Sequence, residues 1–339
     1  MTSDDGSINF TVFRGSKSGK IVGSNVHHAP LTGDQVLVKI THSGLCGTDE
    51  HYRHSDQVLG HEGVGTIVST ATDVKGFKKG DIVGFGYLHS TCGDCEHCLT
   101  GRETFCPARV WYGNGDYDLG SLASHTVWRA SFLFHIPPNM SPAIAAPLQC
   151  AGATIFNAIE GYDTRPTERV GVIGVGGLGH LAVQMAAKMG CTVVVFSGTE
   201  SKKKFAMEAL GAKEFHATAG KDKIEHCEPV DRLIVTTSAL PSWELYMPIL
   251  KPEAKIFPLT VAEGDFSFPA LPMVQQGITI QGTVVAPRAV HQRMLRFCAE
   301  HEVQPVVEEF PMTAEGIQEA FEKMGSGGMR YRGVLVAQD

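Results

Sequence analysis

Residues 169–196 read RVGVIGVGGLGHLAVQMAAKMGCTVVVF, and this stretch decides the fold of the second half of the chain. It begins with an apolar run of β-branched residues, passes through six residues of which four are glycine, and continues as an apolar helical pattern. A second β-branched run, TVVVF, ends the stretch. Strand, glycine turn, helix and strand in this order predict a parallel βαβ unit.

The sequence around this unit continues the alternation of helix and strand. Apolar strands that alternate with helices are typical of a parallel, doubly wound α/β sheet, and we predict this fold for the second half of the chain. The supporting segments are the helical patterns at 153–162 and 201–211 and the strand patterns at 231–237, 255–259 and 279–282.

The two ends of the chain have a different character. Up to about residue 145 the chain consists of short β-runs between glycines and prolines, such as 35–40 and 81–85. After Pro287 come helical patterns at 290–301 and 313–324 and then one strand. A chain of 339 residues is long enough for two domains, so we predict a β-rich domain next to the α/β domain.

Composition argues against several classes of protein. The net charge is −7, and the longest basic run, Lys202–Lys204, is too short for a nucleic-acid surface. We identify no apolar stretch of membrane-spanning length and expect no membrane partner. The first residues, MTSDDGSINF, lack the basic and apolar parts of a signal peptide. Nine cysteines in such a chain predict a reducing, cytoplasmic location.

The glycine turn has the residues that a dinucleotide site needs. Gly174, Gly176 and Gly179 form the pattern G-x-G-x-x-G, and Gly177 and Leu178 lie within it. The first two glycines allow a tight turn and a close approach of a pyrophosphate, while the third lets the helix pack against the strand. The alternative is a tight turn without a ligand, but the flanking strand and helix favour the cofactor.

The choice of cofactor depends on the end of the second strand, where an acidic residue binds the ribose 2′-hydroxyl of NAD(H). Here Ser197, Gly198 and Thr199 stand at this place, and Lys202 follows. Hydroxyls and a cation accept a 2′-phosphate that a carboxylate would repel, so the sequence favours NADP(H). Glu200 leaves open that a carboxylate faces the ribose, and the lysines leave open a solvated helix face.

Four cysteines form a separate local motif. Cys92, Cys95, Cys98 and Cys106 follow the pattern C-x2-C-x2-C-x7-C. A loop this short can wrap four thiolates around one tetrahedral zinc ion, so we predict a structural zinc site. Two disulfides are the alternative, which the cytoplasmic character of the chain disfavours.

A second set of possible metal ligands is dispersed along the chain. Cys46 lies in GLCGTDEH, His61 and Glu62 in GHEGVG, and Cys150 in APLQCAGAT. Each residue alone is a weak signal, because a lone cysteine is more often a small buried side chain than a ligand. Cys46, His61 and Cys150 together make a Cys₂His set with one open coordination position. This ligand set is known from the catalytic zinc of alcohol dehydrogenases.

These features together resemble the zinc-dependent medium-chain alcohol dehydrogenases, and within them the cinnamyl-alcohol-dehydrogenase branch. The resemblance extends over essentially the whole chain, through C-G-T-D, GHE, the four cysteines, GVGGLG and the final MRYRGVLV. It implies a two-domain α/β fold, in which a GroES-like β-rich catalytic domain lies beside a Rossmann domain with the active site between them. We expect the catalytic domain at 1–148, completed by 289–339, and the Rossmann NADP-binding domain at 149–288.

The resemblance also implies roles for individual residues. Glu62 lies beside the catalytic zinc and helps to exchange its water. Thr48 hydrogen-bonds the substrate oxygen, and His51 ends a proton relay. Asp49 orients the imidazole of the histidine ligand. Arg332 lies near the cofactor phosphates.

The implied function is the interconversion of a small-molecule alcohol and an aldehyde or ketone. Two zinc ions per subunit, NADP(H) and a homodimer are implied as well. Three alternatives stay open. A polyol dehydrogenase would use NAD and typically lack a cysteine at the third ligand position, a carbon–carbon double-bond reductase would have lost the catalytic ligands, and a non-enzymatic relative would have a damaged site.

One segment departs from the family pattern. The stretch between His51 and His61 is shorter than the substrate loop of most relatives, so the substrate pocket is expected to be more open or shaped by other loops. Trp111–Tyr112 and Val284–Val285 are candidate pocket walls, with core packing as the alternative.

Overall fold

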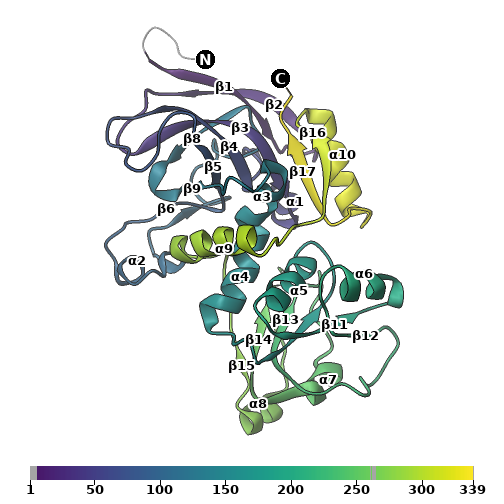
Figure 1. Cartoon of the computed structure of the whole chain (residues 1–339). Coiled ribbons are helices and arrows are strands. Elements are labelled where there is room, and N and C mark those ends of the chain that lie inside the picture. The colour runs from purple at the N-terminus through teal and green to yellow at the C-terminus, as the bar shows by residue number, and fades with distance from the viewer. Residues whose placement is uncertain (1–5, 260, 262–264, 339) are drawn as a thin grey trace. The chain divides into compact units, whose positions relative to one another are not determined.

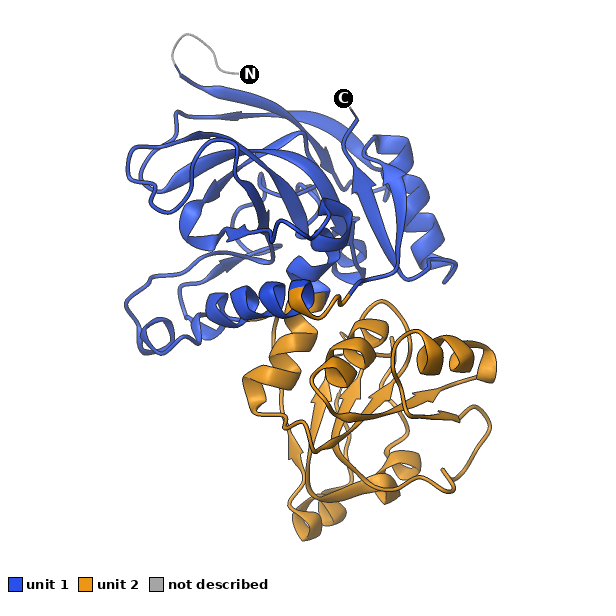
Figure 2. Ribbon diagram, in the orientation of Figure 1, with its two compact units in different colours: residues 1–151, 287–299, 304–339 blue, residues 152–286, 300–303 orange. Residues whose placement is uncertain are grey.

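The computed structural model describes residues 6–259, 261 and 265–338. The chain divides into two compact units (Figure 2). Unit 1 comprises Met1–Ala151, Pro287–Ala299 and Gln304–Asp339, and unit 2 comprises Gly152–Ala286 and Glu300–Val303. Unit 1 therefore contains both ends of the chain, and most of unit 2 is one continuous insertion.

Unit 1 is built around a seven-stranded sheet with the order β16-β17-β3-β4-β5-β9, and β8 joins it by pairing with β3. The last strand, β17, lies antiparallel to β3, so the end of the chain completes a sheet begun near its start (Figure 1). The strands are β3 (Gln35–Leu45), β4 (Gly63–Thr70), β5 (Ile82–Phe85), β8 (His125–Arg129), β9 (Phe134–His135), β16 (Val307–Pro311) and β17 (Arg332–Val336).

Apolar residues of several strands of this sheet pack into a common core. Val36, Val38 and Ile40, at alternate positions of β3, are all fully buried. They belong to one apolar core together with Phe85 and Trp128. Two smaller antiparallel ribbons complete the strands of unit 1: β1 (Ile8–Arg14) with β2 (Val22–His28), and β6 (Leu88–Ser90) with β7 (Val110–Trp111).

The helical segments of unit 1 are short except for two near the end of the chain. Their buried faces, such as Ile317 and Phe321 of the last helix, contribute to the core of the unit. The segments are α1 (Gly47–Tyr52), α2 (Glu96–Leu99), η1 (Glu103–Phe105), η2 (Ala130–Phe132), α3 (Pro142–Pro147), the π-helix η3 (Leu148–Gly152), α9 (Arg288–Glu300) and α10 (Ala314–Gly325).

One apolar run corrects a sequence-based prediction. We predicted no stretch of membrane-spanning length, but within the described residues the helical run Pro142–Tyr162 is 21 residues long with a mean hydropathy of 1.2. Pro147 lies inside this run, although a proline usually ends a helix. The run joins α3, η3, α4 (Ala153–Ile159) and η4 (Glu160–Tyr162). Its apolar window is 72% buried inside the protein, as in the core helix of a globular domain.

Unit 2 contains the predicted parallel, doubly wound sheet. The strand order is β12-β11-β10-β13-β14-β15, and each neighbouring pair is parallel. In chain order this is 3-2-1-4-5-6, the order of dinucleotide-binding doubly wound sheets. The strands are β10 (Arg169–Ile173), β11 (Thr192–Ser197), β12 (Glu214–Ala217), β13 (Val230–Val235), β14 (Leu250–Pro258) and β15 (Thr279–Ile280).

The helices of unit 2 connect these strands. The helices are α5 (Gly179–Lys188), η5 (Glu200–Lys202), α6 (Lys203–Glu208), α7 (Trp243–Tyr246), η6 (Met247–Ile249) and α8 (Ala270–Gln276). The sequence predicted α5, α6 and five of the six strands, but it did not predict α7, α8 or β12. This edge strand has only one buried residue, and its polar residues Glu214 and His216 break the apolar run that predicts a buried strand.

Candidate active site

The C-G-T-D motif forms the N-terminal cap of α1. Cys46 is the N-cap residue, and its sulfur accepts a hydrogen bond from the backbone N–H of Thr48 at 3.4 Å. Asp49 Oδ2 in turn accepts from the backbone N–H of Cys46 at 3.0 Å. This is a capping box in which a cysteine takes the place of serine or threonine. The local sequence therefore fixes the direction of the Cys46 sulfur.

The predicted second metal site comes together in unit 1. Ligand atoms of Cys46, His61, Glu62 and Cys150 all lie within 4.8 Å of one another. The Cys46 sulfur lies 3.1 Å from His61 Nε2, and both His61 and Glu62 are fully buried. Two sulfurs and an imidazole nitrogen at this spacing fit a zinc ion, and three protein ligands leave the fourth position of a tetrahedral ion open.

The two cysteines of this cluster shift each other's pKa in opposite directions. A hydrogen bond from the Cys150 thiol holds the pKa of Cys46 well below its usual range, although burial alone would raise it. The same hydrogen bond raises the pKa of Cys150 well above its usual range, and burial adds to the effect. A bound metal would require both sulfurs as thiolates, so metal binding at this site releases protons.

Cys150 lies in a single turn of π-helix, η3. This turn interrupts the helical run directly after Pro147. Insertions of this kind are frequent at functional sites because they redirect one side chain. The neighbouring Gln149 anchors the turn, since its amide donates to the Ala145 carbonyl at 2.9 Å and its Oε1 lies 3.1 Å from His291 Nε2.

Asp49 lies behind His61, the predicted histidine ligand. His61 Nδ1 is 3.1 Å from Asp49 Oδ1, and the carboxylate is fully buried. This contact favours a proton on Nδ1 and leaves Nε2 to face the sulfurs. Burial lowers the pKa of His61, but the charges of Asp49 and Cys46 outweigh burial and raise this pKa well above the usual range.

The sequence offered Trp111–Tyr112 as a candidate pocket wall but did not predict the contacts of Tyr112 with His61 and Asp49. The side chain of Tyr112 is only 1% exposed, and its ring stacks on His61 with centroids 4.6 Å apart and an interplanar angle of 28°. The hydroxyl donates to Asp49 Oδ1 at 2.9 Å. Tyr112 is therefore a buried residue that contacts the predicted ligand His61, which agrees with the core-packing alternative. No pattern in the sequence around Tyr112 points to this contact.

A buried ion pair connects Glu62 to the end of the chain. Arg332 Nη2 donates to both carboxylate oxygens of Glu62, one of them at 2.6 Å. Burial raises the pKa of Glu62 to about 7, and the Arg332 guanidinium opposes the rise. The cofactor-phosphate role of Arg332 and the water-exchange role of Glu62 stay predictions. What the structure describes is their mutual contact beside the metal ligands.

The two residues of the predicted relay lie on α1. Thr48 follows Cys46 by two positions and is half-buried, whereas His51 is exposed in the last turn of the helix. The relay itself stays a prediction.

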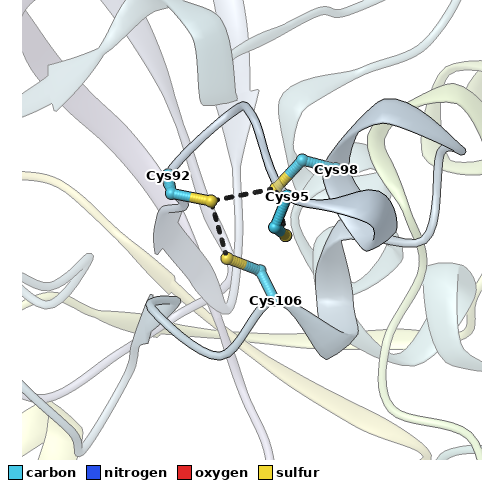
Figure 3. Close-up of side chains that lie close together, drawn as sticks. All are labelled: Cys92, Cys95, Cys98 and Cys106. Atoms are coloured by element: carbon cyan, nitrogen blue, oxygen red, sulfur yellow. Dashed lines mark hydrogen bonds between the residues drawn. The ribbon is translucent and has the colours of Figure 1, made fainter.

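The four-cysteine lobe has the dimensions of a zinc site (Figure 3). The sulfurs of Cys95 and Cys98 are 3.5 Å apart, those of Cys92 and Cys106 are 3.5 Å apart, and those of Cys92 and Cys98 are 3.9 Å apart. Four sulfurs around a tetrahedral zinc ion, each about 2.3 Å from it, are about 3.8 Å from one another. All four are free thiols, so the disulfide alternative is not realised.

The glycine turn of unit 2 lies between β10 and α5 and fits a pyrophosphate. Gly174 has a φ of +91°, which a residue with a side chain rarely adopts. A Cβ on Gly179 would lie 2.0 Å from the Gly174 carbonyl oxygen, so only glycine lets the helix pack here. A Cβ on Gly176 would meet no atom within 4 Å, so open space remains where a phosphate would approach.

The end of β11 has a polar, partly cationic surrounding. Lys202 Nζ donates to the carbonyl oxygen of Val175 in the glycine turn at 2.8 Å. Thr199 and Ser201 share a hydrogen bond of 2.8 Å between their hydroxyls. Glu200, the alternative ribose ligand, forms a 3.1 Å ion pair with Lys203.

Comparison with known proteins identifies the family. A model of the alcohol dehydrogenase GroES-like domain matches residues 32–138, and a model of the zinc-binding dehydrogenases matches residues 177–300. An alcohol dehydrogenase from Geobacillus stearothermophilus is 36% identical over 326 residues, which cover 91% of this chain and 94% of that protein. The chain belongs to the zinc-dependent alcohol dehydrogenases.

Solved structures agree with this assignment. A cinnamyl alcohol dehydrogenase from Sorghum bicolor superposes with a TM-score of 0.87 at 29% identity and covers 97% of this chain and 98% of its own. The CAD of Helicobacter pylori, solved in complex with NADP(H), gives a TM-score of 0.86 at 25% identity with the same coverage. The predicted GroES-like and Rossmann architecture of this alcohol dehydrogenase is confirmed. As a member of the family it is an enzyme that acts on small molecules with zinc and a nicotinamide cofactor.

The described residues also contain a third group of possible metal ligands, on unit 2: Glu214, His216 and Cys227. Arg169 donates two hydrogen bonds of 3.0 Å to the carboxylate of Glu214 and holds its pKa below the usual range. Because this carboxylate already carries a cationic partner, we assign no metal to the group.

Proposed function

We propose that this alcohol dehydrogenase interconverts an alcohol and an aldehyde or ketone with NADP(H), and that Cys46, His61 and Cys150 bind its catalytic zinc. The observation that carries the proposal is the buried convergence of these three side chains from distant segments, with Asp49 behind the imidazole. The four-cysteine lobe would bind a second, structural zinc. We assign catalysis to residues 1–148 and 289–339 and cofactor binding to residues 149–288.

The residues of the chain have separate tasks in this proposal. When bound, zinc acts as a Lewis acid on the substrate oxygen, and the nicotinamide accepts or donates the hydride. Thr48, two residues from the first ligand, hydrogen-bonds the substrate oxygen and passes its proton toward His51. The exposure of His51 supports its place as the end of the relay, where the proton reaches water.

The preference for NADP(H) is supported by the end of β11. Ser197 and Thr199 present hydroxyls there, and the ammonium of Lys202 lies against the glycine turn. Glu200 is engaged by Lys203, which argues against a carboxylate on the ribose. The NADP(H) complex of the Helicobacter pylori relative adds support.

Replacing Ser197 with aspartate tests this preference. We expect kcat/KM for NADPH to fall about 10- to 100-fold, because a carboxylate at the end of β11 repels the 2′-phosphate. The value for NADH should stay the same or rise, since the carboxylate can accept from a free 2′-hydroxyl. Ser326→Asp, an exposed change in the C-cap of α10, is the matched control. A parent enzyme that already prefers NADH would contradict the proposal.

The alternative functions fit the site less well. A polyol dehydrogenase of this family typically lacks the third cysteine ligand, whereas Cys150 lies within the cluster. A carbon–carbon double-bond reductase would have lost the ligands, and a non-enzymatic relative would have a damaged glycine turn. Both the set of ligands and the glycine turn are intact here.

The decisive assay follows NADPH oxidation with benzaldehyde and cinnamaldehyde. We expect turnover by the zinc-loaded protein, loss of turnover after treatment with a chelator, and recovery on addition of Zn²⁺, because the substrate oxygen needs the Lewis acid. The reverse reaction is assayed with the corresponding alcohols and NADP. Failure of the zinc-loaded protein to turn over any aldehyde, ketone or alcohol would refute the enzymatic proposal.

We further propose a cytosolic homodimer. The support for the cytosol is chemical: all nine cysteines are free thiols, as expected in a reducing compartment. The dimer rests on family analogy, and sedimentation of the purified protein tests it.

A further inference from the structure

Tyr112 makes more polar contacts than a tyrosine that only fills space in a core. Its hydroxyl donates to Asp49 Oδ1 at 2.9 Å and accepts from the backbone N–H of Gly60 at 3.1 Å. Its ring stacks on the imidazole of His61 on one side and meets Tyr52 edge-on at 5.2 Å. One side chain thus contacts both the ligand histidine and the carboxylate that orients it.

The carboxylate of Asp49 depends on these contacts for its orientation. It accepts from four donors, namely the backbone N–H groups of Cys46 and Gly60, His61 Nδ1 and the Tyr112 hydroxyl. Three of the four bind the same oxygen, Oδ1. The donors to Oδ1 are the backbone N–H of Gly60 and the side chains of His61 and Tyr112. Of the two side chains, His61 is a proposed metal ligand and Tyr112 is not. The phenol is therefore the side-chain contact that holds Oδ1 toward His61 independently of the ligand itself.

The position of Tyr112 is tied to the four-cysteine lobe. Tyr112 directly follows β7, which pairs with β6 through Leu88 opposite Trp111. The Tyr112 N–H continues this ribbon by donating to the carbonyl of Tyr87 at 2.9 Å. The lobe, from Cys92 to Cys106, is the loop that connects the two strands of the ribbon. Metal binding in the lobe would thus stabilise the β6–β7 hairpin, which positions Tyr112 beside His61 and Asp49.

We propose that Tyr112 is a positioning residue of the catalytic metal site: its hydroxyl orients Asp49 and its ring holds the imidazole of His61, so that Nε2 faces the sulfurs of Cys46 and Cys150. The inference rests on the proposed function only in identifying the metal as catalytic. Outer contacts of this kind typically change metal affinity about 10- to 100-fold. A residue that only packed against its neighbours would be replaceable by phenylalanine at no cost to the metal.

The test compares Tyr112→Phe with Tyr117→Phe. The first change keeps the ring and removes the hydroxyl, while Tyr117 is 53% exposed and serves as the matched control. Zinc affinity is measured by competition with a chromophoric chelator, which resolves the Cys₂His site from the four-cysteine site. We expect Tyr112→Phe to weaken the Cys₂His site about 10- to 100-fold and to leave the four-cysteine site unchanged. If the Cys₂His sites of the two variants bound zinc with affinities within twofold of each other, the proposal would be overturned.

Two further readouts distinguish positioning from packing. In the cobalt-substituted protein, Tyr112→Phe should shift the visible d–d bands of the Cys₂His site, because the imidazole is less well oriented. The hydroxyl acts through Asp49, so its loss should matter little once Asp49 is changed. In the Asp49→Asn background, Tyr112→Phe should lower the zinc affinity of the Cys₂His site by less than about threefold. Fully additive losses of affinity would argue against the coupling. Both readouts are independent of turnover. A parent protein that binds zinc but reduces no aldehyde would refute the proposed function and leave this inference standing.

Discussion

Replacing His61 with glutamine is expected to lower kcat/KM for aldehyde reduction by at least about 10³-fold, equivalent to about 4 kcal/mol of transition-state stabilisation. The imidazole is fully buried, its Nε2 lies 3.1 Å from the Cys46 sulfur, and its Nδ1 lies against Asp49. Glutamine cannot replace the nitrogen ligand while also donating to Asp49 at the same distance. The site should therefore lose its metal, and the zinc content per chain should fall by one.

The matched control for this change is His27→Gln. His27 is an exposed residue of β2 whose imidazole lies 3.0 Å from Asn9 Oδ1, far from any proposed ligand in the sequence. This variant should keep the activity and the zinc content of the parent. The measurements are steady-state NADPH oxidation and metal analysis of the purified proteins. If His61→Gln kept more than a tenth of the parental activity, the assignment of the catalytic zinc to this cluster would be wrong.

Loss of one lobe cysteine, Cys98→Ser, is expected to destabilise the protein before it alters the chemistry. The sulfur of Cys98 lies 3.5 Å from that of Cys95 and 3.9 Å from that of Cys92, so its removal breaks the set of four. We expect a decrease of about 3 kcal/mol or more in the free energy of unfolding, because the binding energy of a structural metal contributes to folding. Chemical denaturation followed by circular dichroism measures it.

The control for the lobe is Cys227→Ser, a half-buried thiol outside it. This change should lower the free energy of unfolding by less than about 1 kcal/mol. At saturating zinc and low temperature, Cys98→Ser should keep the parental activity per folded molecule within about threefold, since all three catalytic ligands remain. If Cys98→Ser were as stable as the parent and lost only the catalytic step, this division of tasks between the two sites would be refuted.

Short-range patterns carried most of the successful predictions. The four lobe cysteines lie within fifteen residues, so their spacing alone predicts that the sulfurs converge, as they do. The glycine turn is equally local, and its strand, turn and helix form as predicted. The doubly wound sheet followed from the alternation of apolar strands and helices, because buried parallel strands need continuous apolar runs.

Long-range contacts set the limit of sequence reasoning. Family resemblance, rather than spacing, brought Cys150 together with Cys46 and His61, because more than a hundred residues separate Cys150 from Cys46. The contact of Tyr112 with Asp49 follows from no such pattern, since it depends on how the β6–β7 ribbon packs. The apolar run Pro142–Tyr162 was missed because only its second part, residues 153–162, was predicted to be helical.

The pairing of β17 with β3 has a consequence for the order in which the protein matures during synthesis. Gly333 of β17 lies opposite Leu45, the residue next to the ligand Cys46, and Arg332 forms the ion pair with Glu62. Both Gly333 and Arg332 follow the strands of unit 2 in the chain, so they leave the ribosome after those strands. Unit 2 can therefore fold before β17 has been synthesised, whereas the metal site reaches its final form only once β17 has paired with β3.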